Sequence, residues 1–375
     1  MEFSLSEETT LLKKNAARFL LGKCPASLIK EFIKDEKGFP VSIWKTMADL
    51  GWLGLVHEET YGGTGGSFFD LCVLFEEMGK VLLPSPFGSS VLSGFLLNES
   101  DDRQIKEKYL PRMISGETIL TLALYDERGK IDFQEPKIEA RETEDGEYIL
   151  SGKRVLVPYA PIADGILMCS NVIGSRIKGP TIFIMPSTAD GLTIIPLETL
   201  TEEKLFGVFF EKVKLSAEDI VDFSGRTNDV LKNLLEKALV CKCAEMVGGM
   251  ERVVEMTVAY VKERQQFGRP LGSLQVIQHF CADMETYAKT SRLLTYQAAQ
   301  FISEGVPCAK EVSMAKAWCS GAYKQCTWIA HQLHGAIGFT EEHDLHRYYK
   351  HAKATELAFG DSRYHRQQVA ECMGY

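Results

Sequence analysis

Apolar residues spaced three and four positions apart indicate helices in the first and last parts of the chain. In the first of these, Leu12, Ala16 and Leu20 fall on one helical face, and Ser4 or Ser6 is placed to cap it. The same spacing predicts helices over residues 43–55, 68–83, 227–265, 272–304, 308–338 and 344–372. The last four are long and separated by short breaks, as in an antiparallel four-helix bundle.

Between residues 116 and 215 the pattern changes to short β-rich runs separated by Gly, Pro, Asp and Asn. These runs are 119–124, 148–150, 155–157, 166–169, 181–185 and 192–195. Their close spacing predicts a compact antiparallel sheet and not βαβ units. We therefore expect a mostly α, α+β fold with an N-terminal helical domain (1–115), a central β domain (116–220) and a C-terminal four-helix bundle (221–375).

Composition narrows the function classes. The chain is 45% apolar and 25% charged, which is typical of globular proteins. Its formal net charge of −9 argues against a nucleic-acid partner. The acidic N-terminus lacks a signal-peptide pattern, and no apolar run approaches the ~18 to 20 residues of a membrane span. Ten scattered cysteines without CxxC pairs predict reduced thiols in a cytoplasmic protein, with neither disulfides nor zinc.

Three local motifs occur in a suggestive order. The first is Y-G-G-T-G-G at 61–66 leading to F-E-E-M-G at 75–79, which lacks the lysine of a P-loop. The second is R-Q-Q-F-G at 264–268, followed by Gln275, and the third is Q-L-H-G-A-I-G at 332–338. Each one alone describes an ordinary turn or glycine-terminated helix.

Together with the layout of helices, β segment and bundle, these motifs resemble the acyl-CoA dehydrogenases along nearly the whole chain. The resemblance implies an FAD-dependent oxidoreductase that desaturates an acyl-CoA thioester between its α and β carbons. It also implies electron transfer to an electron-transfer flavoprotein and a homodimer or homotetramer.

The resemblance assigns FAD contacts in two groups. A guanidinium matches phosphate oxygens, and glycines bring backbone amides close to an anion. The first group, expected to contact the pyrophosphate and adenosine parts of a neighbouring subunit's FAD, is Arg264, Phe267 and Gln275. The second group, expected to contact the diphosphate chain, is Gln332, Gly335 and Gly338.

The segments expected to face the flavin ring fall on Leu124, Tyr125 and Pro158. The family's threonine hydroxyls are missing at Tyr125 and Pro158. Main-chain groups or the Tyr125 hydroxyl are the alternative partners for the ring.

The family's reaction also needs a carboxylate base near the substrate α carbon. Its usual position near the last helix is Phe359 here, and its alternative position on the first bundle helix is Ala238. Neither residue accepts a proton. The displaced candidates are Asp361 and Glu236, and each is equally readable as a structural carboxylate.

Three explanations remain open for the missing base. The base is relocated, the chain is a base-deficient partner subunit of a mixed oligomer, or the same fold performs another reaction, such as 1,4-dehydrogenation or reduction of a ring acyl-CoA. The F-G-D ending at 359–361 resembles a divergent bacterial branch linked to sterol side-chain, alicyclic and aromatic acyl-CoA breakdown.

His343 and His346 are spaced for a shared metal, but a site needs more ligands, so no metal is expected. No G-x-S-x-G elbow indicates a hydrolase.

Overall fold

The structure is a computed structural model that describes residues 5–35, 37–133, 136–174, 179–201 and 203–375. The chain folds into two compact units, each built from separate segments. The first unit comprises Met1–Lys30, Ser67–Leu83 and Glu236–Tyr375, and the second comprises Glu31–Gly66 and Pro84–Leu235.

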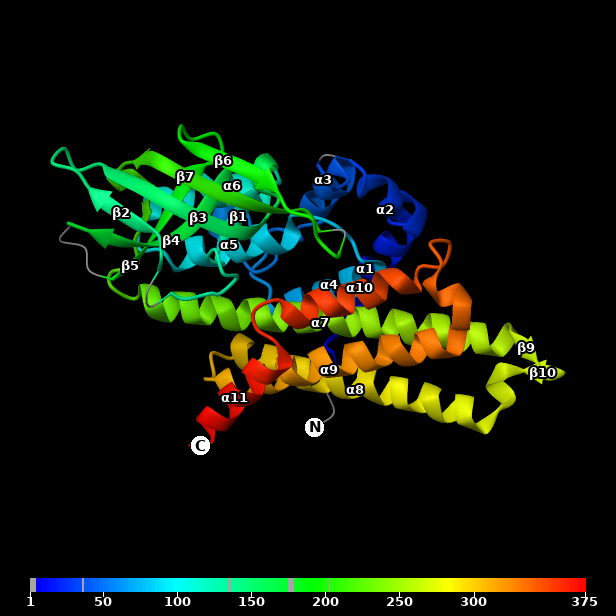
Figure 1. The fold of residues 1–375 in the computed structure, drawn as a ribbon. Coiled ribbons are helices and arrows are strands. Elements are labelled where there is room, and N and C mark those ends of the chain that lie inside the picture. The colour runs from blue at the N-terminus through cyan, green and yellow to red at the C-terminus, as the bar shows by residue number, and fades with distance from the viewer. Residues whose placement is uncertain (1–4, 36, 134–135, 175–178, 202) are drawn as a thin grey trace. The chain divides into compact units, whose positions relative to one another are not determined.

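The first unit is helical (Figure 1). Its helices are α1 (Glu7–Lys23), the start of α2 (Ala26–Phe32), α4 (Phe68–Val81), most of α7 (Thr227–Glu263), α8 (Gln275–Ser303), α9 (Ala309–His334), α10 (Leu345–Leu357) and α11 (Ser362–Cys372). Ser6 caps α1, since its hydroxyl accepts from the Thr9 N–H at 3.0 Å. Ser4, the other candidate for this cap, lies outside the described residues.

The single helix predicted over 344–372 is in fact two helices. A turn at residues 358–361 separates α10 from α11, because Phe359 and Gly360 adopt positive φ angles of 59° and 100°. An α-helix cannot continue through two such residues. Similarly, α9 ends at His334, and residues 335–339 form a short 3-10 turn, η5 (Gly335–Phe339).

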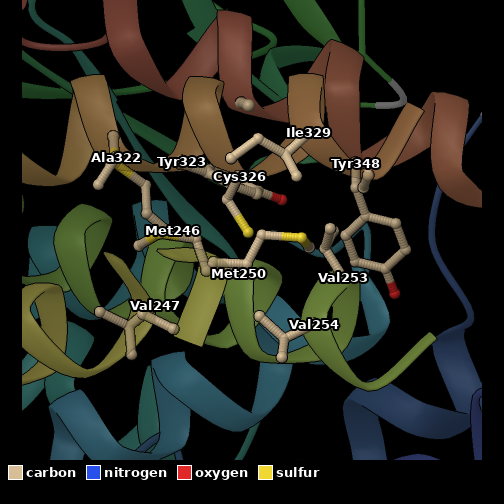
Figure 2. Packing of buried hydrophobic residues seen from close by; sticks show 14 of the residues in the cluster. Met246, Val247, Met250, Val253, Val254, Ala322, Tyr323, Cys326, Ile329 and Tyr348 are labelled. Atoms are coloured by element: carbon tan, nitrogen blue, oxygen red, sulfur yellow. The ribbon is translucent and has the colours of Figure 1, made fainter. Parts of the chain in front are cut away.

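Sulfur-containing and β-branched side chains fill the core of this unit. Met246, Met250 and Val253 of α7 pack against Cys326 and Ile329 of α9 (Figure 2). Unbranched methionines adapt to the irregular gaps between crossing helices. The pattern that predicted the bundle therefore corresponds to its real interior.

A buried ionic network ties α4 to three other helices. The Glu76 carboxylate, fully buried, accepts from Lys13 Nζ at 2.5 Å, from Arg292 Nη2 at 3.0 Å and from the Tyr296 hydroxyl at 2.9 Å. Arg292 also pairs with Glu251 of α7. Each buried charge thus has an opposite charge in contact, as burial requires.

The second unit combines helices with one sheet. Its helices include α3 (Val41–Asp49), α5 (Phe87–Glu99) and α6 (Arg103–Ile114). Its strands are β1 (Leu120–Ala123), β2 (Glu139–Glu142), β3 (Tyr148–Pro158), β4 (Gly165–Ile173), β5 (Pro180–Pro186), β6 (Leu192–Pro196), β7 (Leu205–Leu215) and β8 (Ile220–Val221).

The strand order is β6-β7-β3-β2-β4-β5-β8, with β1 pairing with β4 beside this path. Most neighbours are antiparallel, as expected, but β1 and β2 both run parallel to β4. The runs predicted at 148–150 and 155–157 are one strand, β3, whose register shifts along β7 at two bulges. A bulge interrupts the alternation of side chains, which explains why the sequence pattern divided this strand.

Candidate cofactor and catalytic site

The junction of α7 and α8 carries three of the predicted cofactor residues. Arg264 directly follows α7, and Gln275 is the first residue of α8. Between them, β9 (Gln265–Gln266) and β10 (Arg269–Pro270) form a hairpin with Phe267 at its tip. The Phe267 side chain is 88% exposed, and the exposed Arg264 and Gln275 side chains have no side-chain partner among the described residues. All three are therefore available to a ligand or a second chain.

The end of α9 carries the second group. Gly335 has φ 65° and ψ −143°, a backbone conformation essentially restricted to glycine. A Cβ on Gly338 would lie 3.2 Å from the His334 Cβ and 3.2 Å from the Leu345 Cδ2, so a larger residue at this position would be tightly packed. Gln332 is exposed on the last turn of α9.

Tyr260 of α7 contacts His334 of α9 and so brings these two groups together, at the end of the bundle where α7 leads into β9 and β10 (Figure 1). It lies one turn before Arg264 on α7, and its ring stacks on His334 of α9 with centroids 4.4 Å apart. Its hydroxyl donates to the His334 carbonyl at 3.3 Å. Hence residues predicted from motifs about 70 positions apart in sequence converge in space, as a shared ligand requires.

The charged form of the histidines beside the glycine turn is disfavoured by burial. His331 Nδ1 donates to the Thr327 carbonyl at 2.9 Å, and His334 Nδ1 donates to the Ala330 carbonyl at 2.8 Å. Burial lowers the pKa of both imidazoles below their ordinary value. The exposed guanidinium groups of Arg264 and Arg269 therefore supply positive charge at this end of the bundle more readily than His331 or His334. Within the described part of the chain, no group of three or more possible ligands could hold a metal.

The segments predicted to face the flavin ring are adjacent within the second unit. The Thr121 hydroxyl donates to the Pro158 carbonyl at 2.6 Å, and the Val155 N–H donates to the Tyr125 carbonyl at 3.1 Å. Leu124 and Tyr125 follow β1, whereas Pro158 ends β3. The carbonyls of Pro158 and Tyr125 are thus already used within the sheet.

The base candidates occupy separate places on the first unit. Asp361 caps α11, since its Oδ1 accepts from the Tyr364 N–H at 2.8 Å, and this bond lowers the pKa of the carboxyl. Glu236 is half-buried on α7. Burial and the negative charge of Glu236 together raise the pKa of Cys308, just before α9, to about 11.

These two carboxylates do not form a pair. Glu236 acts on Cys308, while the turn containing Asp361 is held near Ala317, whose carbonyl accepts from Ser362 Oγ at 3.0 Å. Along the direction of α9, residues 308 and 317 are ~14 Å apart at 1.5 Å per residue.

Comparison with known proteins resolves the family. Residues 6–117 match the model of the acyl-CoA dehydrogenase N-terminal domain, and residues 228–374 match that of the C-terminal domain. The chain belongs to the acyl-CoA dehydrogenase family. Acyl-CoA dehydrogenases are flavoprotein oxidoreductases, and FAD is the cofactor.

Two relatives and one structure illustrate the similarity. The chain is 29% identical to acryloyl-CoA reductase (NADH) of Anaerotignum propionicum, over 99% of this chain and 95% of the relative. It is 26% identical to the caffeyl-CoA reductase-Etf complex subunit CarC of Acetobacterium woodii, over 96% of each. The ChsE4-ChsE5 complex of Mycobacterium tuberculosis contains a chain with a TM-score of 0.90 and 26% identity, covering 100% of this chain and 99% of that one.

The residues of this acyl-CoA dehydrogenase family member fit FAD. The free guanidinium of Arg264 and the exposed backbone at Gly335 suit a diphosphate, and the carboxamides of Gln275 and Gln332 add neutral hydrogen-bonding groups. A Cβ built on Gly335 meets nothing within 4 Å, so the space beside this turn is open. Separately, among the described residues no helix has both the length and the apolar content needed to cross a membrane.

Proposed function

We propose that this protein oxidises the bond between the α and β carbons of an acyl-CoA thioester and passes the electrons to an electron-transfer flavoprotein. Bound FAD supplies the hydride acceptor. The observation that carries the proposal is the convergence of Arg264 with the turn at Gly335, through the contact between Tyr260 and His334. The name of the CarC relative, a subunit of a complex that includes Etf, supports the electron partner.

A second copy of the chain is part of this proposal, as a homodimer or homotetramer. The Phe267 ring is 88% exposed, and large apolar side chains on α9, η5 and α10 are exposed as well. They are Trp318, Trp328, Ile337, Phe339 and Tyr349. Exposed aromatic patches of this kind usually mark interaction surfaces. A partner protomer would cover them and complete each FAD site.

If this chain works as a dehydrogenase on its own, the residue that removes the α proton is the least supported part of the proposal. Glu236 lies two residues before the buried Ala238, and this separation corresponds to a rotation of ~200° around the helix. Its carboxylate therefore points away from the direction of the Ala238 side chain. Asp361 is already engaged in capping α11, and its lowered pKa makes it a weaker base. If the base is relocated within this chain, Glu236 and Asp361 are the candidates.

This geometry favours a second candidate function, a base-deficient subunit of a mixed oligomer. Both usual base positions, Phe359 and Ala238, lack a carboxyl group. The similar chain in the ChsE4-ChsE5 complex comes from an assembly of two named components. In such an assembly this chain would contribute FAD contacts, and its companion would contribute the base.

A third possibility is that the preferred direction is reduction of an unsaturated acyl group, including a ring acyl-CoA. Two relatives carry the name of acyl-CoA reductases. In that direction a proton is delivered to the α carbon and not removed from it. An alicyclic or otherwise unusual acyl group remains part of the proposal because of the F-G-D ending at residues 359–361.

The cofactor site is tested by replacing Arg264 with alanine. A lost hydrogen bond to a charged group removes about 1.5–3 kcal/mol of binding energy, so the Kd for FAD should rise about 10- to 150-fold. The matched control is Arg252→Ala, which removes a partly exposed arginine of α7 that pairs with Glu255 at 3.1 Å. Flavin absorbance per chain after gel filtration measures the result. Equal flavin retention by R264A and R252A would contradict the proposed site.

The reaction is tested by mixing the flavin-loaded protein anaerobically with saturated acyl-CoAs of linear and alicyclic type. Bleaching of the flavin supports dehydrogenation. Reoxidation of the reduced protein by an enoyl-CoA, without bleaching by its saturated counterpart, supports the reductive direction. A chain that acquires flavin only with a second, different subunit supports the mixed oligomer. Glu236→Gln and Asp361→Asn then identify the base, and bleaching that survives both changes excludes these two residues.

A further inference from the structure

A buried lysine lies beneath the turn between α10 and α11. Lys316, on α9, has a fully buried side chain. Its ammonium donates to the Gly360 carbonyl at 2.8 Å, to the Glu356 carbonyl at 2.9 Å and to the Ser320 hydroxyl at 3.2 Å. An ammonium has three N–H bonds, and these three acceptors use all of them.

The position of this ammonium has an electrostatic reason. The last carbonyls of an α-helix lack helical partners and form the negative end of its dipole. Lys316 meets the Glu356 carbonyl at this end of α10 and, beyond it, the Gly360 carbonyl of the turn. The cation thereby replaces the hydrogen bonds that a continued helix would have made.

Other charged and titratable groups near Lys316 lie on α7, α9, α10 and α11. They are Lys242 and Cys243 of α7, Cys319 of α9, Glu356 of α10, and Asp361 and His365 at the start of α11. Burial, reinforced by the positive charge of Lys242, lowers the pKa of Lys316 to about 8. At pH 7 the side chain is still mainly charged.

A second buried side chain holds the same turn. His365 Nε2 donates to the Phe359 carbonyl at 3.0 Å. A Cβ on Gly360 would lie 2.6 Å from the Tyr364 ring and 3.1 Å from His365 Nε2, so the turn has no room for a larger residue there. The carbonyls of residues 356, 359 and 360 are thus all held by buried side chains.

We propose that Lys316 is a positioning residue, whose ammonium joins the carbonyls of Glu356 and Gly360 and so fixes the turn that places Phe359 where other family members carry their base. The inference rests on the proposed function, because that function makes this turn a wall of the acyl site. Burying a cation costs free energy that a methionine in the same place would not cost. A lysine here therefore serves the conformation of the turn better than it serves stability.

The test compares Lys316→Met with Lys324→Met. Lys324 is two turns further along α9, is partly exposed, and contacts the Glu356 carboxylate at 3.2 Å without touching a turn carbonyl. Deuterium exchange is measured on a peptide covering residues 357–366 of the flavin-loaded protein. In K316M this peptide should exchange about tenfold faster than in the wild type, with peptides of α7 unchanged, and K324M should match the wild type. Wild-type exchange in K316M, or an equal rise throughout the first unit, would overturn the proposal.

Kinetics separate positioning from a merely structural role. With flavin content and Tm retained, K316M should bleach about tenfold more slowly with the best acyl-CoA of the panel, and Lys316→Arg should restore part of the rate. Bleaching at the wild-type rate would overturn the proposal. A protein that binds no flavin would refute the proposed function, and the exchange of the 357–366 peptide would then be compared between K316M, K324M and the wild type in their flavin-free forms.

A second measurement applies if K316M fails to fold. In Cys319→Ala protein, which lacks the neighbouring buried thiol whose pKa is lowered, burial still lowers the pKa of Lys316, so the side chain loses its third proton over an interval below the ordinary lysine value of 10.5. Its hydrogen bonds to the carbonyls of Glu356 and Gly360 then lose their charge. After correction for intrinsic rates, the peptide at 357–366 should lose protection over this interval, and α7 peptides should not. Unchanged protection would overturn the proposal.

Discussion

Gly248 lies at a close contact between α4 and α7, and alanine at this position should destabilise the first unit. A Cβ there would overlap the Glu76 carbonyl oxygen and lie 2.8 Å from the Glu76 carbonyl carbon and 3.0 Å from the Lys80 nitrogen. These are backbone atoms, so they cannot rotate away as a side chain would. Helix α4 has to move, and Glu76, the centre of the buried ionic network, moves with it.

The magnitude follows from two opposing terms. Overpacking a tight interior costs about 1–3 kcal/mol, and more when backbone must shift. Alanine in place of glycine within a helix returns about 1 kcal/mol. A net loss of about 2 kcal/mol corresponds to a Tm lower by about 4–8 °C for a unit of this size.

Gly321 of α9 provides a matched control. A Cβ there meets nothing within 4 Å, so Gly321→Ala gains helix propensity without a clash. Its Tm should stay at the wild-type value or rise by about 2–4 °C. Both variants are heated at one scan rate, since unfolding of a large flavoprotein can be irreversible. If G248A melts with or above G321A, the reasoning from the α4–α7 contact is refuted.

Two further predictions concern the turn before α11. Asp361→Ala removes a helix cap and should lower Tm by about 2–4 °C, whereas Asp361→Asn keeps an acceptor and should stay near the wild type; a Tm loss in D361N equal to that in D361A would argue against the cap. Because folding lowers the pKa of Asp361, its ionic contribution is present above the ordinary value of 3.8 and is lost as the pH falls through the folded value. Burial lowers the pKa of His365 from 6.5 to about 4, so the unfolded chain takes up this proton first. The stability that neutral His365 contributes is complete above pH 6.5 and declines towards about pH 4. Between these two pH values the denaturation midpoint of His365→Gln should therefore fall less than that of the wild type. Midpoints of the two proteins that fall in parallel would contradict the assignment.

The turn at residues 358–361 also shows why the sequence motif and the chemistry diverge here. Phe359 is predicted to stand where other family members carry their base. Its backbone is held by His365, which binds the Phe359 carbonyl, and by Lys316, which binds the carbonyl of Gly360. The same turn engages Asp361 as a cap. Backbone hydrogen bonds to a carboxylate stabilise its charged form, and this stabilisation opposes the uptake of a proton by the carboxylate.

Sequence alone determined the features that depend on residues close together along the chain. Helical periodicity located α1, α4, α7, α8 and α9. The sequence predicted a serine cap for α1 at Ser4 or Ser6, and the structure shows the cap at Ser6. The glycine motif at 332–338 marked the end of α9. Such features follow from backbone preferences and spacing within a few turns, so a single sequence is sufficient to reveal them. The same motifs, taken in order, identified the family that the comparisons confirm.

Tertiary structure alone decided which distant residues meet. The parallel pairing of β1 and β2 with β4 depends on how separate strands assemble, and local alternation does not encode it. The contact between Tyr260 and His334 joins the two groups of predicted cofactor residues, and neither motif predicts this contact. Lys316 looks like any helical lysine until packing buries it against the end of α10. Burial and long-range hydrogen bonds arise only when helices pack, and they turn an ordinary side chain into a candidate functional group.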